Sequence, residues 1–189
     1  MTIDAIIWDF GGVFTSSPFE AFNRYEADRG LPKDLIRSLN ATNPDANAWA
    51  LFEQAKIDAA GFDVLFLQES TAAGHAVRGA DVLPLLSGRF RPAMEQALRT
   101  CKLHFKVGCI TNNMAQGYGP GMAATQTGAD AGARIMALFD TVIESSKAGV
   151  RKPDPRIYQM MCERLRWSPR RASISTIWGS TANRRRRWA

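Results

Sequence analysis

The chain has 189 residues, of which 46% are hydrophobic and 22% charged, as expected for one globular domain or one domain with an insert. No apolar run approaches the roughly 20 residues that a membrane-spanning helix needs, and the first residues lack a signal-peptide pattern. The three cysteines include no CxxC pair, which argues against a disulfide framework or a zinc site. We therefore expect a cytoplasmic protein with reduced cysteines and no membrane partner.

The net charge of +6 is concentrated near the carboxyl end. Eight arginines and no acidic residue occur from Arg164 onward, and removing these eight charges changes the formal net charge from +6 to −2. The run Arg184–Arg187 could contact phosphate in a disordered tail. A charge confined to one end favours a loose basic tail over a specific nucleic-acid partner.

The first predicted element is a buried parallel strand over the apolar residues 6–8, which leads directly into Asp9. Gly11 and Gly12 follow at once, so the backbone of the turn can lie close to a bound group. Open α/β sheets bind ligands at the carboxyl ends of their strands. Asp9 could there act as a nucleophile or hold a cation, or it could simply cap the turn.

A helical block of roughly 70 residues is predicted next, from about Ser17 to Gly88, by its 3.6-residue periodicity. Breaks near Gly30–Pro32, Asn43–Pro44 and Gly61 divide it into four expected helices. The block carries no chemical motif of its own, and we interpret it as an inserted cap.

Residues 91–102 predict a helix, and Lys106–Ile110 a second strand that ends in Thr111 and Asn112. Hydroxyl and amide side chains at a strand end indicate an anion site or a turn. Residues 116–132 hold five glycines without Walker or GxGxxG spacing, and they predict a flexible loop leading into a helix.

A third strand is predicted over Phe139–Ile143, and a helix from Arg156 to Leu165. Lys152 precedes that helix, where its ammonium group could reach the same strand-end cleft. A lysine in a loop is more often only solvated.

These patterns together resemble the haloacid dehalogenase-like hydrolase superfamily: Asp9-x-Gly-Gly after a strand, Thr111-Asn112 after a strand, and Lys152-Pro153 before a helix. The closest likeness is to the phosphatase-like branch that includes the N-terminal domain of soluble epoxide hydrolases. The resemblance covers residues 4 to about 165, and residues 139–158 are its most specific part.

The resemblance implies an α/β fold, with a Rossmann-like core around a parallel sheet and a helical cap inserted after the first strand. The expected limits are 1–15 and 92–175 for the core, 16–91 for the cap and 176–189 for an atypical basic tail. The core would be truncated at its carboxyl end, which would leave a sheet edge exposed. Oligomeric state stays open.

The resemblance also implies roles for the residues at the strand ends. Asp9 matches the nucleophile that forms a covalent ester, Thr111 the residue that binds the transferring group, and Lys152, rather than Lys147, the charge-stabilising lysine. Asn112 and Gly12 would contact a small phosphorylated substrate. Mg²⁺ would be held by Asp9 and by the Gly11 carbonyl.

Two departures from the family pattern bear on activity. Phosphatases of the family carry a general acid–base aspartate two positions after the nucleophile, where this chain has Gly11. The fourth motif, a strand ending in acids that hold magnesium, is replaced by residues 173–179 without an acid. We expect weak Mg²⁺ binding. Phosphate-ester hydrolysis is the first interpretation, and a non-catalytic relic or a 2-haloacid dehalogenase, which needs no such aspartate, are the alternatives.

The composition changes abruptly after about Leu165, which we interpret as a shifted reading frame relative to an ancestor. Codons shifted by one base across Ile174–Gly179 can read Leu-Asp-Asp-Leu-Gly, which has the look of the missing fourth motif.

Overall fold

A three-stranded parallel sheet lies at the centre of the computed structural model, which describes residues 4–113 and 125–166. The predicted α/β class with a parallel sheet is therefore confirmed. The strands pair in the order β1–β2–β3, and they are β1 (Ala5–Trp8), β2 (Lys106–Thr111) and β3 (Thr141–Glu144). Trp8 lies opposite Cys109, and Thr111 lies opposite Glu144. All three carboxyl ends consequently meet at one edge of the sheet.

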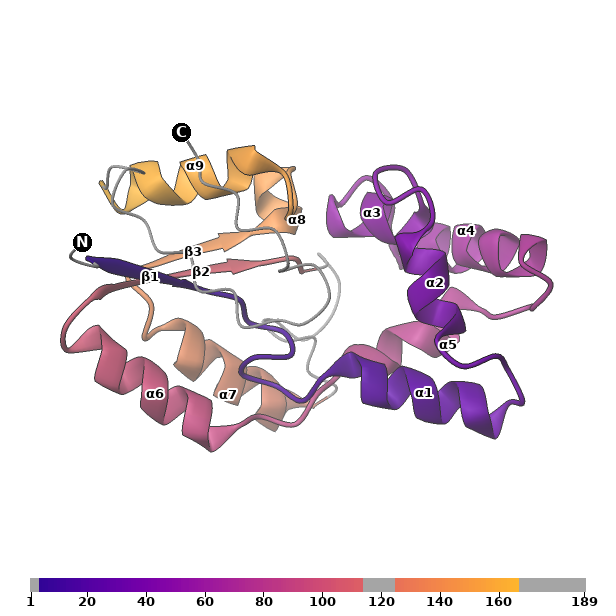
Figure 1. The fold of residues 1–189 in the computed structure, drawn as a ribbon, viewed down its shortest axis with the longest axis horizontal. Helices are drawn as coiled ribbons and strands as arrows, with labels where there is room; N and C mark the ends of the chain where they lie inside the picture. Colours follow the sequence, from indigo (N-terminus) through magenta and orange to yellow (C-terminus); the bar gives the residue numbers. More distant parts are fainter. Residues whose placement is uncertain (1–3, 114–124, 167–189) are drawn as a thin grey trace.

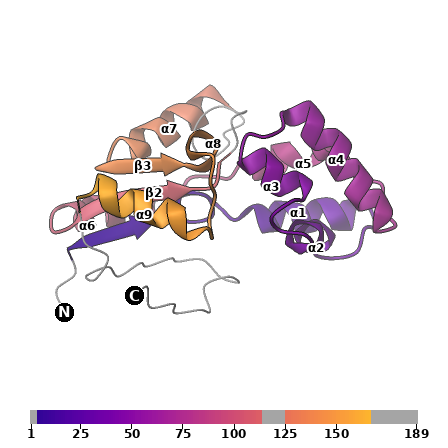
Figure 2. The same cartoon turned by 90° about the horizontal axis from the view of Figure 1, so that it is seen from above.

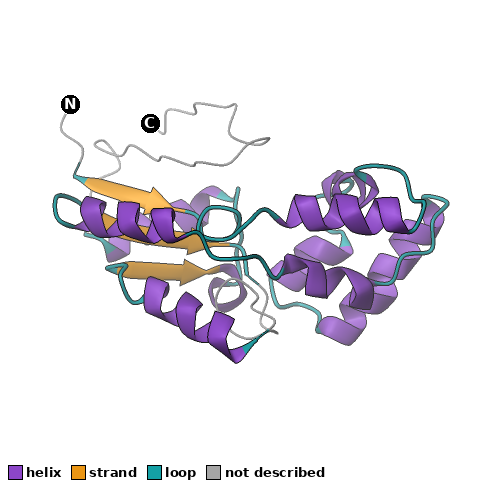
Figure 3. Cartoon of the chain, turned by 90° about the horizontal axis from the view of Figure 1, so that it is seen from below, coloured by secondary structure: helices purple, strands orange, loops and turns teal. Residues whose placement is uncertain are grey.

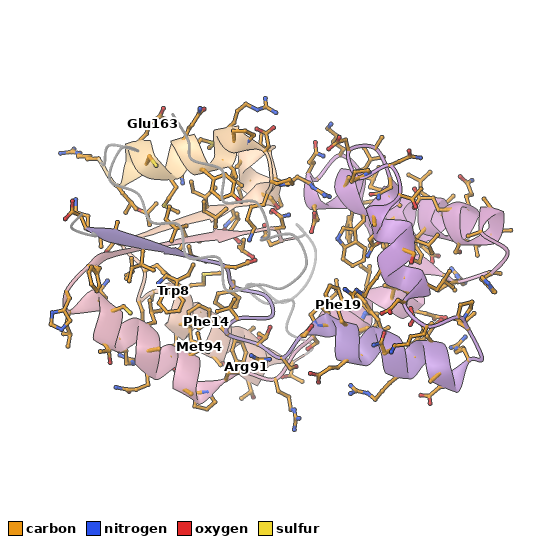
Figure 4. All side chains as sticks on the ribbon, viewed as in Figure 1. Trp8, Phe14, Phe19, Arg91, Met94 and Glu163 are labelled. Carbon is orange, nitrogen blue, oxygen red and sulfur yellow. The ribbon has the colours of Figure 1, made fainter. Side chains whose placement is uncertain are left out.

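Helices cover both faces of the sheet (Figure 1). One face carries α6 (Pro92–Lys102) and α7 (Gln126–Met136), and the other carries α8 (Ser145–Ala148) and α9 (Pro155–Arg164). Trp8 and Phe14 pack between β1 and α6 in the first of the two resulting hydrophobic cores (Figure 4). Ile157 and Met161 of α9 pack in the second core, against the opposite face. Because helices cover both faces, β1 is apolar throughout and β2 is buried from Val107 to Thr111.

A second body consists of helices only, as Figures 2 and 3 show. Its elements are α1 (Pro18–Asp28), α2 (Leu35–Ala41), α3 (Ala48–Glu53), α4 (Ala59–Ala72), α5 (Gly79–Val82) and the 3-10 helix η1 (Leu83–Leu86). A separate hydrophobic cluster holds it together, with Phe62 between Phe52 and Phe66. We call this body the cap and the sheet with its helices the core; the limits at 16 and 91 stay a prediction.

Buried acidic side chains help to fold the cap. The Glu26 carboxylate, on α1, accepts hydrogen bonds from the backbone N–H groups of Asp34 (2.8 Å) and Ile36 (2.9 Å). These N–H groups lie at the start of α2, where a helix offers no partner of its own. Glu26 therefore has a structural role: it joins α1 to the start of α2 within the cap.

The two linkers between cap and core run side by side. Thr15 and Phe90 form an antiparallel bridge. The Ser16 N–H donates to the Arg89 carbonyl at 2.8 Å, and the Arg89 N–H donates to Ser16 Oγ at 3.1 Å. Gly88 lies against this contact: a Cβ there would be 2.8 Å from the Ser16 carbonyl oxygen. The linkers are thus joined into one narrow ribbon.

The cap contains α5 and η1 in addition to the four expected helices, and two further element boundaries differ clearly from the sequence predictions. Helix α7 begins at Gln126, inside the predicted loop 116–132, because the Thr125 side chain accepts a hydrogen bond from Gly128 N and caps the helix. Strand β3 begins at Thr141, because Phe139 packs into the core before the strand starts.

Several sequence predictions fall on residues 167–189, outside the described residues. They are the basic tail 176–189, the region of the absent fourth motif and the proposed frame shift around Ser175–Gly179. Within the described part, β1 has β2 as its one hydrogen-bonded neighbour. None of the helices there combines the length and the apolar character needed to cross a membrane.

We expect Gly88→Ala to lower the free energy of unfolding by about 1–3 kcal/mol, because the added methyl group must push the two linkers apart. Urea unfolding measures this effect. Gly11→Ala is the matched control, since within residues 4–113 and 125–166 a Cβ at Gly11 meets no atom within 4 Å. Equal losses in the two variants would contradict the close linker contact.

Candidate functional site

Asp9 stands immediately after β1, at the sheet edge where the strand ends meet. Its Oδ1 accepts a hydrogen bond from the Phe10 N–H at 2.7 Å. The turn continues through Gly12, whose φ of 77° is one that glycine adopts without strain. The Gly12 N–H donates to Thr15 Oγ1 at 3.0 Å. The N–H group of Gly12, a residue predicted to contact the substrate, therefore has its hydrogen bond within the turn.

Lys152 meets Asp9 across the site. Its Nζ lies 2.6 Å from Asp9 Oδ1 and also donates to the Ile110 carbonyl at 2.8 Å. The two side chains are only 15% and 19% exposed, so water screens the pair less than it would a surface pair. Lys147, the alternative lysine, is 77% exposed and pairs with Glu144. The structure thus places Lys152, and not Lys147, against the predicted nucleophile.

Asn112 holds the backbone of Lys152 from both sides. Its Oδ1 accepts from the Lys152 N–H at 2.8 Å, and its Nδ2 donates to the Lys152 carbonyl at 3.1 Å. Asn112, predicted to contact substrate, consequently positions the lysine in this structure. Thr111 is buried at the end of β2, one residue beyond the carbonyl that Lys152 contacts. The strand order therefore brings the ends that carry Asp9 and Thr111 side by side.

The cap contributes a glutamate that the sequence analysis missed. Glu53, the last residue of α3, has its Oε2 2.8 Å from Arg151 Nη1 and 3.3 Å from Asn112 Nδ2. Its Oε1 accepts from Trp49 Nε1 at 3.1 Å, and its backbone carbonyl accepts from Ser145 Oγ at 2.9 Å. The Glu53 side chain is 10% exposed. One cap residue thus joins the cap to three core residues.

Burial raises the pKa of Glu53 above its ordinary value, because a charged carboxylate loses hydration there. The Arg151 cation opposes this shift most strongly, followed by the Trp49 hydrogen bond and the Lys152 charge. The Asp9 charge adds to the shift. Glu53 therefore belongs to the same electrostatic cluster as Asp9 and Lys152.

Magnesium ligands are few in the described residues. No three side chains among His, Cys, Asp and Glu gather there into a metal-binding group. Asp9 and the Gly11 carbonyl supply oxygen atoms of the kind that Mg²⁺ accepts. One carboxylate and one carbonyl would suit a Mg²⁺ ion that keeps several water ligands and takes a further ligand from a bound phosphate group.

Three residues of this cluster were not predicted, and the sequence carries a signal for some of them but not for all. Arg151 stands directly before Lys152 in the segment that carries the resemblance, so its position was a usable signal. Ser145 likewise follows the end of a strand, directly after Glu144. Glu53 gives no signal, because it follows the apolar residues Leu51 and Phe52 at the end of an ordinary helix.

A family model described as haloacid dehalogenase-like hydrolase matches residues 3–172 of the chain. Among curated proteins, acyl-CoA dehydrogenase family member 10 from Mus musculus is 27% identical over 186 residues. That match covers 93% of this chain and 16% of the mouse protein, so the chain spans about a sixth of the length of that relative.

Three solved structures illustrate the shared fold. A predicted HAD-like family hydrolase from Porphyromonas gingivalis has a TM-score of 0.56 at 17% identity, over 90% of this chain and 80% of that one. A HAD family enzyme from Bacteroides thetaiotaomicron, in complex with magnesium and inorganic phosphate, gives 0.55 at 13% identity, over 97% of both chains. An L-2-haloacid dehalogenase from Xanthobacter autotrophicus with covalently bound chloropropionic acid gives 0.55 at 16% identity, over 93% and 69%.

The raised pKa of Glu53 predicts a pH dependence of stability with a defined sign. Folding favours the protonated carboxyl group, so this contribution is full below the ordinary glutamate pKa of about 4.3 and is lost as pH rises through the folded-state pKa. Glu53→Gln removes the titration. We therefore expect the variant to gain stability relative to wild type as pH rises above about 4.3, measured by urea unfolding.

Glu95→Gln is a control of opposite sign. The Arg99 and Arg134 guanidinium groups lower the pKa of Glu95, so its contribution is present above the ordinary pKa and is lost as pH falls. If Glu53→Gln instead loses stability relative to wild type as pH rises, as expected for Glu95→Gln, then attraction to Arg151 outweighs burial in setting the pKa of Glu53.

Proposed function

Because the chain belongs to the haloacid dehalogenase-like hydrolase family, we propose that it hydrolyses a small-molecule phosphate ester through an aspartyl-phosphate at Asp9. The observation that best supports this proposal is the contact of Lys152 Nζ with Asp9 Oδ1 at 2.6 Å, at the carboxyl ends of parallel strands. A cation held beside a carboxylate offsets the repulsion that an anionic substrate would otherwise meet.

The contacts of Asp9 support one of its two oxygens as the attacking atom. The bonds from Lys152 Nζ and from the Phe10 N–H both go to Oδ1. Since both of these contacts within residues 4–113 and 125–166 go to Oδ1, Oδ2 would form the bond to phosphorus while the bond from phosphorus to the ester oxygen breaks. Attack of water on the aspartyl-phosphate then releases inorganic phosphate and restores the carboxylate.

The remaining strand-end groups assist this displacement. Thr111 at the end of β2 would donate a hydrogen bond to the transferring phosphoryl group, and Lys152 would balance its charge. Asn112 keeps Lys152 in place through its two backbone hydrogen bonds. Mg²⁺, when bound by Asp9 and the Gly11 carbonyl, would supply further charge stabilisation.

A second candidate activity is hydrolysis of a 2-haloacid, and the absence of a carboxylate at Gly11 favours it. An alkoxide leaving group needs a proton, whereas a halide does not. In this reaction Asp9 Oδ2 would displace halide from carbon and form a carbon ester that water then hydrolyses. Halide release from 2-chloropropionate, against phosphate release from aryl phosphates, separates the two candidates.

We expect Asp9→Asn to reduce turnover in either assay to background, because the amide keeps the shape of the side chain but is not a nucleophile. Asp154→Asn is the control, since Asp154 pairs with the exposed Arg156 in the same segment. Full turnover in Asp9→Asn would refute the assignment of Asp9 as the nucleophile. Absence of both activities in the wild-type chain would favour a non-catalytic member of the family.

If the reaction is phosphate-ester hydrolysis, Gly11→Asp should raise turnover by about 10²–10⁴-fold, because it supplies the proton that the leaving alkoxide needs. Space among the described residues permits the change, since a Cβ at Gly11 meets no atom of theirs within 4 Å. Gly11→Asn has the same shape without an acidic proton and should give no gain. Equal rates in the two variants would show that the proton comes from elsewhere.

A further inference from the structure

We propose that Arg151 and Asn112 form a binding site for a second acidic group of the substrate, and that Glu53 of the cap occupies this site when substrate is absent. The proposal rests on the proposed function, because it takes the Asp9–Lys152 pair as the place of the reacting phosphate. It assigns the substrate to a class: small molecules with a phosphate and a carboxylate, or a second phosphate, a few bonds apart.

The donors at this site converge on a carboxylate. Arg151 Nη1 lies 2.8 Å and Asn112 Nδ2 3.3 Å from the same oxygen, Glu53 Oε2. A guanidinium group beside an amide donor suits a planar acid, and arginine is the usual residue for such recognition. The cap carboxylate therefore identifies the chemistry that the two core residues select.

The contact with Glu53 leaves Arg151 incompletely satisfied. Nη1 is buried and close to Glu53 Oε2, yet within the described part of the chain it has no acceptor aligned with its N–H bonds. A buried donor without an aligned acceptor carries a free-energy cost. An acid that entered along those N–H bonds would remove this cost, so a ligand can compete with the internal carboxylate.

Position relative to the reacting centre limits the size of the ligand. The Glu53 carboxylate that Arg151 Nη1 contacts is also close enough to Lys152 and Asp9 for both of their charges to act on it. Asn112 connects the two places: it holds the Lys152 backbone and donates to Glu53 Oε2, the oxygen that Arg151 Nη1 contacts. One small molecule can therefore place its phosphate at Lys152 and its second acid at Arg151.

Glu53 must give way for this to happen, and its attachment makes that possible. Glu53 belongs to the cap, whereas both donors belong to the core, so separating the two bodies exposes Arg151 and Asn112 together. Closure without a ligand returns Glu53 to them. The cap glutamate therefore competes directly with the acidic group of the substrate.

Two phosphonates test the proposal without any turnover, because their carbon–phosphorus bonds resist hydrolysis. 3-Phosphonopropionate carries the second acid, and propylphosphonate has a methyl group in its place. In calorimetric titration of the wild-type chain, we expect the dissociation constant of 3-phosphonopropionate to be at least about tenfold lower than that of propylphosphonate. Arg151→Gln should abolish this preference, whereas Glu53→Gln should tighten binding of 3-phosphonopropionate alone.

Arg156→Gln is the matched control, since Arg156 is an exposed arginine in the same segment and should keep the preference. Equal affinities of the two ligands for the wild-type chain, or no binding of either, would overturn the proposal even if Arg151→Gln failed to fold. An unchanged ratio in Glu53→Gln would overturn the role of Glu53. These results measure binding only, so they can fail while the Asp9-dependent turnover test succeeds.

Discussion

The ion pair between Asp9 and Lys152 is the interaction on which the rest of the site depends. Two charges that are each less than one-fifth exposed are stable only when they are paired and hydrogen-bonded. The sheet meets this condition by its topology: β1 delivers Asp9, and the carbonyl of Ile110 on the neighbouring β2 accepts the second bond of the lysine. Asn112, also following β2, fixes the lysine backbone. The site is thus built from the register of two parallel strands.

Much of this arrangement could be predicted from the sequence, because it follows from local patterns. An apolar run that ends in Asp9 and another that ends in Thr111 predict two parallel strands with polar ends at one edge. The position of Lys152 before a proline and a helix predicts the third component. The helical insert was equally visible, since phenylalanine and leucine recur there at helical spacing.

The features that escaped prediction depend on tertiary contacts or on conflicting local signals. Glu53 meets Asn112 from 59 positions away in the sequence, and only the docking of α3 on the core brings the two together. Gly128 and Gly132 weigh against a helix at the start of α7, yet the Thr125 cap and burial of Gly132 against the core favour it. In both cases packing between elements outweighs the local pattern.

The paired linkers restrict the way in which the cap can move. Because Ser16 and Arg89 are hydrogen-bonded to each other, the two chain crossings act as one axis of rotation rather than as two independent tethers. In Figure 1, α3 lies at the top of the cap and these crossings lie at its bottom, both on the side that faces the core. Displacement grows with distance from an axis, so a small rotation moves the end of α3 much further than it moves the linkers. Hydrogen bonds tolerate changes of only a few tenths of an ångström, so the angular position of the cap decides almost all-or-none whether the contacts of Glu53 are made.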